Sequence, residues 1–250
     1  MQEQKYTLKE PECFNLKDIF TCGQCFRWKE NEEKGYTGVV GKNVIKIKQD
    51  GKDYILESKG EDNLEKLAIE YFDLKRDYKK IQNTLSNIDE NMEKSIKYGQ
   101  GIRILNQDLW EMIISYIISA NNNIPRIKGI IERLSKTYGR EIDWNGEKYY
   151  TFPTPEKLKD VTVEDYRKLG TGFRDIRLYE TVHMVLDKKV DLEEMQNNPN
   201  TMEVREQLLT LSGVGPKVAD CILLFSTLKR FEVFPIDVWV RRVMNELYIK

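Results

Sequence analysis

Two residues near the end of the chain, Lys217 and Asp237, have the types and the setting for covalent chemistry. A lysine amine that is kept neutral is a nucleophile toward electrophilic carbon. A carboxylate facing it can stabilise a cationic transition state and move protons. The chain has one histidine, His183, which excludes a multi-histidine metal centre and any triad built on another histidine. Chemistry must therefore come from lysine, carboxylates or thiols.

A glycine-rich turn before Lys217 predicts a helix-hairpin-helix. Residues 213–215 read Gly-Val-Gly, and Pro216 suits the first turn of a second helix because its missing N–H would be unpaired there. That helix has a buried stripe of Val218, Cys221, Ile222 and Phe225. A glycine turn followed by a helix N-terminus presents backbone N–H groups, which bind a phosphate without side-chain charge.

Both reactive residues also have structural explanations. Lys217 lies in the first helical turn, where the helix dipole repels an ammonium and favours the free, nucleophilic amine. The alternative is a solvated lysine that only touches a phosphate. Asp237 precedes residues 238–243, which predict another helix, so it is in position to cap that helix. Capping and catalysis are compatible roles for one carboxylate.

Composition limits the classes of protein. With 40 basic and 41 acidic residues the net charge is −1, which is not typical of a protein that coats nucleic acid. Any DNA surface must be a local patch or must use backbone amides. The chain has four cysteines: Cys13, Cys22, Cys25 and Cys221. Their number and spacing favour four unrelated thiols over a secreted disulfide framework or a zinc site.

Hydropathy gives no membrane signal. No apolar run reaches the length of a membrane span, and the first ten residues contain no apolar signal region. We therefore expect a soluble cytoplasmic monomer without a membrane partner.

The pattern of elements predicts an α+β fold in two domains. Three strands are expected, at 36–40, 44–48 and 54–56. Helices are expected at 64–71, 89–97 and 109–120, the last apolar nearly all round. Helices of two to four turns follow, separated by residues 153–155, 170–172 and 197–200. Asp50-Gly51 is a hairpin turn, and almost no strand signal follows Gly101. We expect a small antiparallel β-rich domain over 1–100 and an all-α domain containing the hairpin over 101–250.

Four motifs resemble those of one family. Residues 211–220, Leu-Ser-Gly-Val-Gly-Pro-Lys-Val-Ala-Asp, with Val-Phe-Pro-Ile-Asp-Val at 233–238, look like the helix-hairpin-helix–Gly/Pro–Asp signature of DNA glycosylases. Within that superfamily, the 8-oxoguanine DNA glycosylase family is similar at three more segments: Cys-Gly-Gln-Cys-Phe-Arg-Trp at 22–28, Ser-Ala-Asn-Asn-Asn-Ile-Pro-Arg at 119–126 and Leu-Gly-Thr-Gly-Phe-Arg at 169–174. Motifs in register over nearly the whole chain are far more specific than one motif.

The resemblance implies a bifunctional DNA glycosylase and lyase that excises 8-oxoguanine from double-stranded DNA in base-excision repair. Lys217 would attack the anomeric carbon and form a Schiff base, with Asp237 as the catalytic carboxylate. The Gly23 carbonyl would read the N7–H that oxidised guanine has and guanine lacks. Cys221 and Phe225 would line the base pocket.

The resemblance also implies contacts with DNA. Asn121 and Phe173 would fill the gap left by the flipped nucleotide, and Arg126 and Arg174 would recognise the orphaned cytosine. The remaining DNA contacts would come from Gly213, Gly215 and Trp239. No cofactor is required, although the resemblance allows a cation on the hairpin carbonyls of Leu209, Leu211 and Val214.

Several assignments have simpler alternatives. Residues 121–123 could be only a helix-ending turn, Phe173 a buried loop anchor, and Gly23 a requirement of its own turn. One rival function is a monofunctional glycosylase for alkylated or mismatched bases, which would not need Lys217. Another is a non-catalytic helix-hairpin-helix module that only holds DNA phosphates.

Some features depart from the family pattern. Pro125 replaces a usually smaller residue, Phe173 a frequent tyrosine and Trp239 a familiar histidine, which puts the opposite-base preference in question. The family has a further C-terminal helix that closes on the damaged base, so with an end at Lys250 we expect a truncated chain or a pocket closed differently. The iron–sulfur branch is disfavoured because no C-terminal four-cysteine cluster is present.

Overall fold

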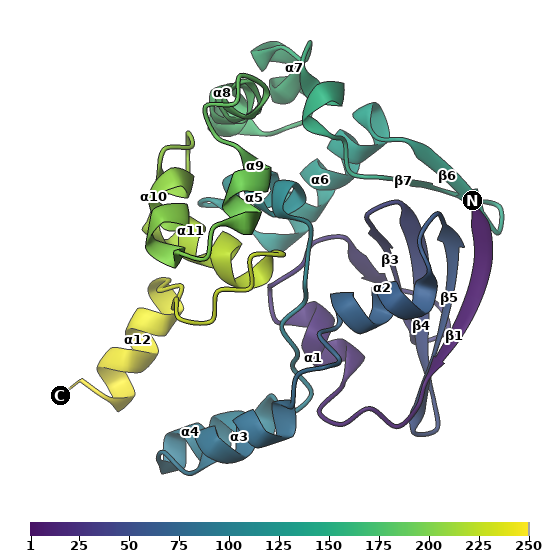
Figure 1. Ribbon diagram of the computed structural model, residues 1–250, viewed down its shortest axis with the longest axis vertical. Helices are drawn as coiled ribbons and strands as arrows, with labels where there is room; N and C mark the ends of the chain where they lie inside the picture. Colours follow the sequence, from purple (N-terminus) through teal and green to yellow (C-terminus); the bar gives the residue numbers. More distant parts are fainter. Residues whose placement is uncertain (250) are drawn as a thin grey trace. The chain divides into compact units, whose positions relative to one another are not determined.

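The computed structural model describes residues 1–249, which form two compact units (Figure 1). Unit 1 consists of Met1–Asn106 with Arg140–Thr151, and unit 2 of Gln107–Gly139 with the chain from Phe152 onward. Unit 1 thus includes Arg140–Thr151, which the sequence analysis placed in the second domain. The domain boundary near residue 100 stays a prediction, whereas the α+β class is confirmed.

Unit 1 is built on a five-stranded antiparallel sheet in the order β1-β5-β4-β3-β2. Its strands are β1 (Gln2–Leu8), β2 (Trp28–Glu30), β3 (Tyr36–Val40), β4 (Asn43–Asp50) and β5 (Asp53–Gly60). The three predicted strands are confirmed as β3, β4 and β5. The predicted turn joins β4 to β5, where Asp50 pairs with Asp53. The two edge strands, β1 and β2, were not predicted individually.

Four helices belong to unit 1: α1 (Leu16–Thr21), α2 (Leu64–Tyr71), α3 (Tyr78–Ser86) and α4 (Glu90–Tyr98). Helices α2 and α4 lie where the sequence predicts them. Each of the four begins after a residue whose side-chain oxygen accepts a hydrogen bond from a backbone amide of the first turn: Asn15, Asn63, Asp77 and Asp89. These N-caps satisfy amides that would otherwise be unpaired, so they fix where each helix starts.

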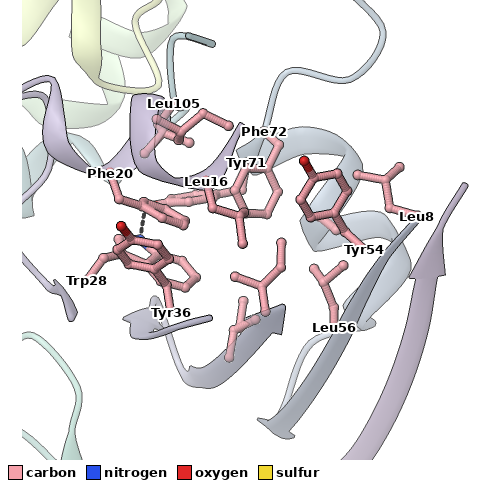
Figure 2. Close-up of a cluster of buried hydrophobic side chains, with 14 of the residues drawn as sticks. Leu8, Leu16, Phe20, Trp28, Tyr36, Tyr54, Leu56, Tyr71, Phe72 and Leu105 are labelled. Carbon is pink, nitrogen blue, oxygen red and sulfur yellow. Dashed lines mark hydrogen bonds between the residues drawn. The ribbon is translucent and has the colours of Figure 1, made fainter. Parts of the chain in front are cut away.

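Aromatic side chains fill the core between this sheet and its helices (Figure 2). Phe20 stacks on Trp28 with ring centroids 4.2 Å apart, and Trp28 Nε1 donates to the Tyr71 hydroxyl at 2.8 Å. A Cβ on Gly38 would lie 2.4 Å from the indole, so a glycine in β3 lets the ring lie directly on the sheet. Trp28 therefore buries a large apolar area with its N–H satisfied.

A short hairpin contradicts the expectation of almost no strand in the second half of the chain. β6 (Glu141–Trp144) and β7 (Glu147–Tyr150) pair antiparallel across Asn145 and Gly146, whose φ values are +54° and +78°. Its apolar side chains join a buried cluster of unit 1 around Val44. An Asn-Gly turn is a strong hairpin signal, but strands of four residues show little alternation.

Unit 2 is helical. Its α-helices are α5 (Leu109–Ser119), α6 (Ile124–Tyr138), α7 (Val163–Lys168), α8 (Asp175–Leu186), α9 (Leu192–Asn197), α10 (Thr201–Leu209), α11 (Pro216–Phe225) and α12 (Val238–Leu247). Two 3₁₀ turns accompany them, η1 (Pro155–Leu158) and η2 (Gly172–Arg174). Every residue of α5 from Leu109 to Ile118 is buried, which confirms the predicted apolar helix. Among residues 1–249 no helix has the length and apolarity needed to cross a membrane.

The loop of unit 1 that carries Gly23 is anchored by the buried side chain of Gln24. The Gln24 amide nitrogen donates to the Ile19 carbonyl at 2.9 Å and to the Arg103 carbonyl at 2.8 Å. The Gln24 amide oxygen accepts from the Leu105 backbone N–H at 2.9 Å. Because Gln24 is 1% exposed, water does not reach these groups to replace the bonds. Gln24 therefore fixes the path of the loop.

We expect the substitution Gln24→Leu to lower the free energy of unfolding by about 2–4 kcal/mol, because each buried backbone group left unpaired costs about 1–3 kcal/mol. Urea unfolding measures the change. Gln49→Leu is the control, because Gln49 is exposed at the end of β4 and its change should stay within about 0.5 kcal/mol. Equal losses in the two variants would contradict the anchoring role.

Candidate active site

The turn between α10 and α11 forms the helix-hairpin-helix that the sequence predicts. Gly213 has a φ of +86°, in the left-handed region that favours glycine, and the Val214 N–H donates to the Leu211 carbonyl at 3.1 Å. Gly215 precedes α11 and Pro216 is its first residue. Within the described chain, the amides of Gly213 and Gly215 donate no hydrogen bond. Unpaired amides at such a turn are suited to bind an anion.

Lys217 lies half-buried in the first turn of α11. Its positive charge acts on the thiol of Cys221, one turn further along the same helix, and partly opposes the raised pKa of that thiol. The Lys217 amine lies 5.7 Å from the centroid of the Tyr116 ring on α5. No carboxylate of residues 1–249 forms an ion pair with it. Without a carboxylate partner, the amine is not held in an ion pair, and in its neutral form it can attack an electrophile.

The buried side chains of Cys221 and Tyr116 lie beside this amine, and the half-buried ring of Phe225 packs on Tyr116. Phe225 stacks on Tyr116 with ring centroids 6.2 Å apart and ring planes at 20°. Burial raises the pKa of the Cys221 thiol, and the positive charge of Lys217 only partly opposes the shift. Cys221 is thus a neutral thiol near pH 7 and contributes surface rather than a nucleophile. Tyr116 was not among the predicted site residues, because its place beside Lys217 depends on how α5 packs on α11.

Asp237 caps α12, as predicted. Its Oδ1 accepts from the backbone N–H groups of Trp239 at 2.9 Å and Val240 at 2.8 Å. Its second oxygen, Oδ2, has no hydrogen bond within residues 1–249. The negative charge of Asp237 is a minor contribution to the raised pKa of the Cys221 thiol on α11. One oxygen is fixed by the cap, and the other is available to a cationic substrate.

Other predicted residues of unit 2 lie on η2, at the end of α5 and at the start of α6. Phe173 is 54% exposed, which contradicts the alternative that it is a buried loop anchor. Asn121 has a φ of +51°, a left-handed conformation that asparagine tolerates. Arg126 Nη2 donates to the Gly170 carbonyl at 3.2 Å. An exposed aromatic ring on a well-anchored turn is suited to enter a gap in a stack of bases.

Arg174 is buried, with 1% of its surface exposed. Its guanidinium lies 4.3 Å from the Phe173 ring centroid. Its Nε donates to the Ala120 carbonyl at 2.9 Å, its Nη1 to the Thr171 carbonyl at 3.0 Å and its Nη2 to the Asn121 carbonyl at 2.8 Å. These bonds tie η2 to the end of α5. In this structure Arg174 therefore positions Asn121 and Phe173, and its three nitrogens are all engaged.

The remaining predicted contacts stay predictions. Trp239 is 65% exposed on α12, with the Arg242 guanidinium 4.9 Å from its ring centroid. Gly23 of unit 1 has a φ of +91°, so its turn alone already favours glycine. The proposed cation carbonyls belong to the hairpin residues Leu209, Leu211 and Val214. Among residues 1–249 no group of three or more histidine, cysteine, aspartate or glutamate side chains could hold a metal ion.

Two family models match consecutive parts of the chain. The N-terminal domain of 8-oxoguanine DNA glycosylase matches residues 6–113. The HhH-GPD superfamily of base excision DNA repair proteins matches residues 114–250.

Two solved structures and one further relative are similar to this chain. The 8-oxoguanine glycosylase/lyase of Clostridium acetobutylicum in its apo-form is 41% identical with a TM-score of 0.93, covering 100% of this chain and 87% of that chain. The complex of the same enzyme with double-stranded DNA containing cytosine opposite 8-oxoG is 40% identical with a TM-score of 0.92, covering 99% and 86%. A probable N-glycosylase/DNA lyase of Methanothermobacter thermautotrophicus is 36% identical over 72% of this chain. The match spans 63% of that relative's length.

The cap and the chemistry of Asp237 can be separated by substitution. We expect Asp237→Ala to destabilise α12 by about 0.5–2 kcal/mol, whereas Asp237→Asn keeps a capping oxygen and changes the helix little. Hydrogen exchange of the Trp239 and Val240 amides reports on the cap directly. Unchanged exchange in the alanine variant would contradict the capping role.

Proposed function

This chain belongs to the HhH-GPD superfamily of base excision DNA repair proteins, and we propose that it excises 8-oxoguanine from double-stranded DNA and then acts as a lyase on the abasic site. The observation that carries the proposal is a lysine amine without a carboxylate partner on α11, together with a helix-capping carboxylate that keeps one oxygen free of hydrogen bonds within residues 1–249. The Lys217 amine has no carboxylate partner in the described chain, and Oδ2 of Asp237 has no hydrogen bond there. A monofunctional glycosylase needs only the second of these groups.

In the proposed reaction, Lys217 Nζ forms a bond to C1′ of the damaged nucleotide as the N-glycosidic bond breaks. The bonding electron pair leaves with the base, which takes up a proton. The developing positive charge on the sugar is stabilised by the Asp237 carboxylate. Loss of a proton from nitrogen and opening of the sugar ring give the Schiff base. Removal of a C2′ proton then expels the 3′ phosphate, and water releases Lys217 from the remaining sugar.

Recognition of the base is assigned to the surface beside Lys217. Cys221 and Phe225, whose ring packs on Tyr116, are apolar side chains that would contact a flipped base. The Gly23 carbonyl remains the proposed acceptor for the N7–H of oxidised guanine, on the family resemblance alone. An unpaired buried acceptor is costly, so one hydrogen bond can discriminate against guanine.

The proposed DNA surface is centred on Phe173 and the hairpin. Phe173 and Asn121 fill the space left by the flipped nucleotide, and the amides of the glycine turn bind backbone phosphate. Arg126 recognises the orphaned cytosine. Arg174 would have to leave three backbone carbonyls to do the same, so we assign it to holding the Asn121 turn.

Single-turnover excision on a duplex with one 8-oxoguanine opposite cytosine tests the proposal. We expect Lys217→Gln and Asp237→Asn each to slow base release by about 10²–10⁴-fold, while binding to a duplex with an abasic-site analogue stays within a few-fold. Asp191→Asn is the matched control, because Asp191 caps α9 through the same kind of bonds. It should excise at the wild-type rate.

The alternatives give different results in the same assay. Full excision by Asp237→Asn would overturn the assignment of the carboxylate. Base release that survives in Lys217→Gln while strand cleavage is lost would indicate a monofunctional glycosylase. Duplex binding by the wild type without any excision would indicate a binding module.

A further inference from the structure

Helix α8 carries an arginine that lies across the hairpin turn. A Cβ built on Gly213 would lie 2.7 Å from Arg177 Cδ and 3.4 Å from its Cβ and Cγ, so the stem of Arg177 covers this glycine. One turn further along α8, Thr181 Oγ1 donates to the Ser212 carbonyl at 3.4 Å. Two successive turns of α8 therefore contact the hairpin, and the stem of Arg177 is held against Gly213, whose amide donates no hydrogen bond in the described chain.

The guanidinium of Arg177 has no acidic partner. It lies 5.2 Å from the centroid of the Phe173 ring, and no carboxylate of residues 1–249 forms an ion pair with it. Arg126 and Arg174 are close by: besides burial, the charges of Arg126 and Arg177 lower the pKa of the Arg174 guanidinium. The positive charges of these three arginines repel one another because no carboxylate of the described chain pairs with them, and a bound anion would reduce this repulsion.

We propose that Arg177 is a phosphate-binding residue that acts together with the backbone amides of the hairpin on one DNA phosphate. The inference rests on the proposed function, since it assumes a DNA substrate. A guanidinium fork suits phosphate oxygens and stays charged, whereas amides alone supply only partial charge. Because the net charge of the chain is −1, the cation that assists the hairpin has to be local.

Salt dependence of DNA binding tests this role, since each neutralised phosphate contributes about 0.9 to the slope of log K against log salt concentration. We compare the wild type with Arg177→Met, which keeps an apolar stem over Gly213, and with Arg177→Lys, which keeps the charge. Lys189→Met is the control, because it removes one positive charge just beyond the far end of α8. Affinities for an undamaged duplex and for a duplex with an abasic-site analogue are measured by anisotropy at several KCl concentrations.

We expect Arg177→Met to reduce the slope by about 1 and to weaken binding to both duplexes by the same factor, about tenfold. Arg177→Lys should keep most of the slope, and Lys189→Met should match the wild type. An unchanged slope in Arg177→Met would overturn the proposal even if affinity fell, because a merely structural role does not alter ion release. A loss confined to the abasic duplex would also overturn it, in favour of lesion recognition.

The test separates this inference from the proposed function, because binding to undamaged DNA does not require excision. A chain that shows the Arg177-dependent slope but excises nothing would retain the phosphate site and lose the glycosylase assignment. A wild-type chain that binds neither duplex would overturn both.

Discussion

The site depends on how closely the backbone turns between α10 and α11. Gly213 must adopt a φ of +86° and must also leave room for the stem of Arg177, so a side chain there would be strained and would collide. Pro216 begins the next helix immediately afterwards, which places Lys217 in its first turn. The position of the proposed nucleophile is therefore fixed by the same turn that presents the amides proposed to bind phosphate.

The spacing of an α-helix then determines which residues of α11 lie on the same side as Lys217. Lys217, Cys221 and Phe225 follow one another at intervals of about one turn, so they share one side of the helix. Tyr116 from the buried helix α5 lies against this side, and the charge of Asp237, the N-cap of α12, acts on Cys221. In the proposed function, partial charges of helix termini and a few local side chains attract the DNA phosphates, as bulk positive charge does in more basic proteins.

Roles that depend on a residue's own segment could be predicted from the sequence. The glycine hairpin, the buried helix α5 and the cap at Asp237 each follow from a local pattern, and the structure has all three. Roles that depend on packing between segments could not. No sequence pattern indicates that the ring of Tyr116 lies near Lys217. The same holds for the burial of Arg174 against carbonyls at the end of α5. The hairpin at 141–150 was missed because only its Asn-Gly turn was informative.

Borohydride trapping tests the central claim most directly, because reduction makes a Schiff base permanent. A duplex containing one 8-oxoguanine opposite cytosine is incubated with the wild type or with Lys217→Gln in the presence of borohydride, and the adduct is mapped by peptide mass spectrometry. We predict a covalent adduct in the wild type on the peptide that carries Lys217, and none in the variant. An adduct on another amine, or an undiminished adduct in Lys217→Gln, would contradict the assignment of the nucleophile.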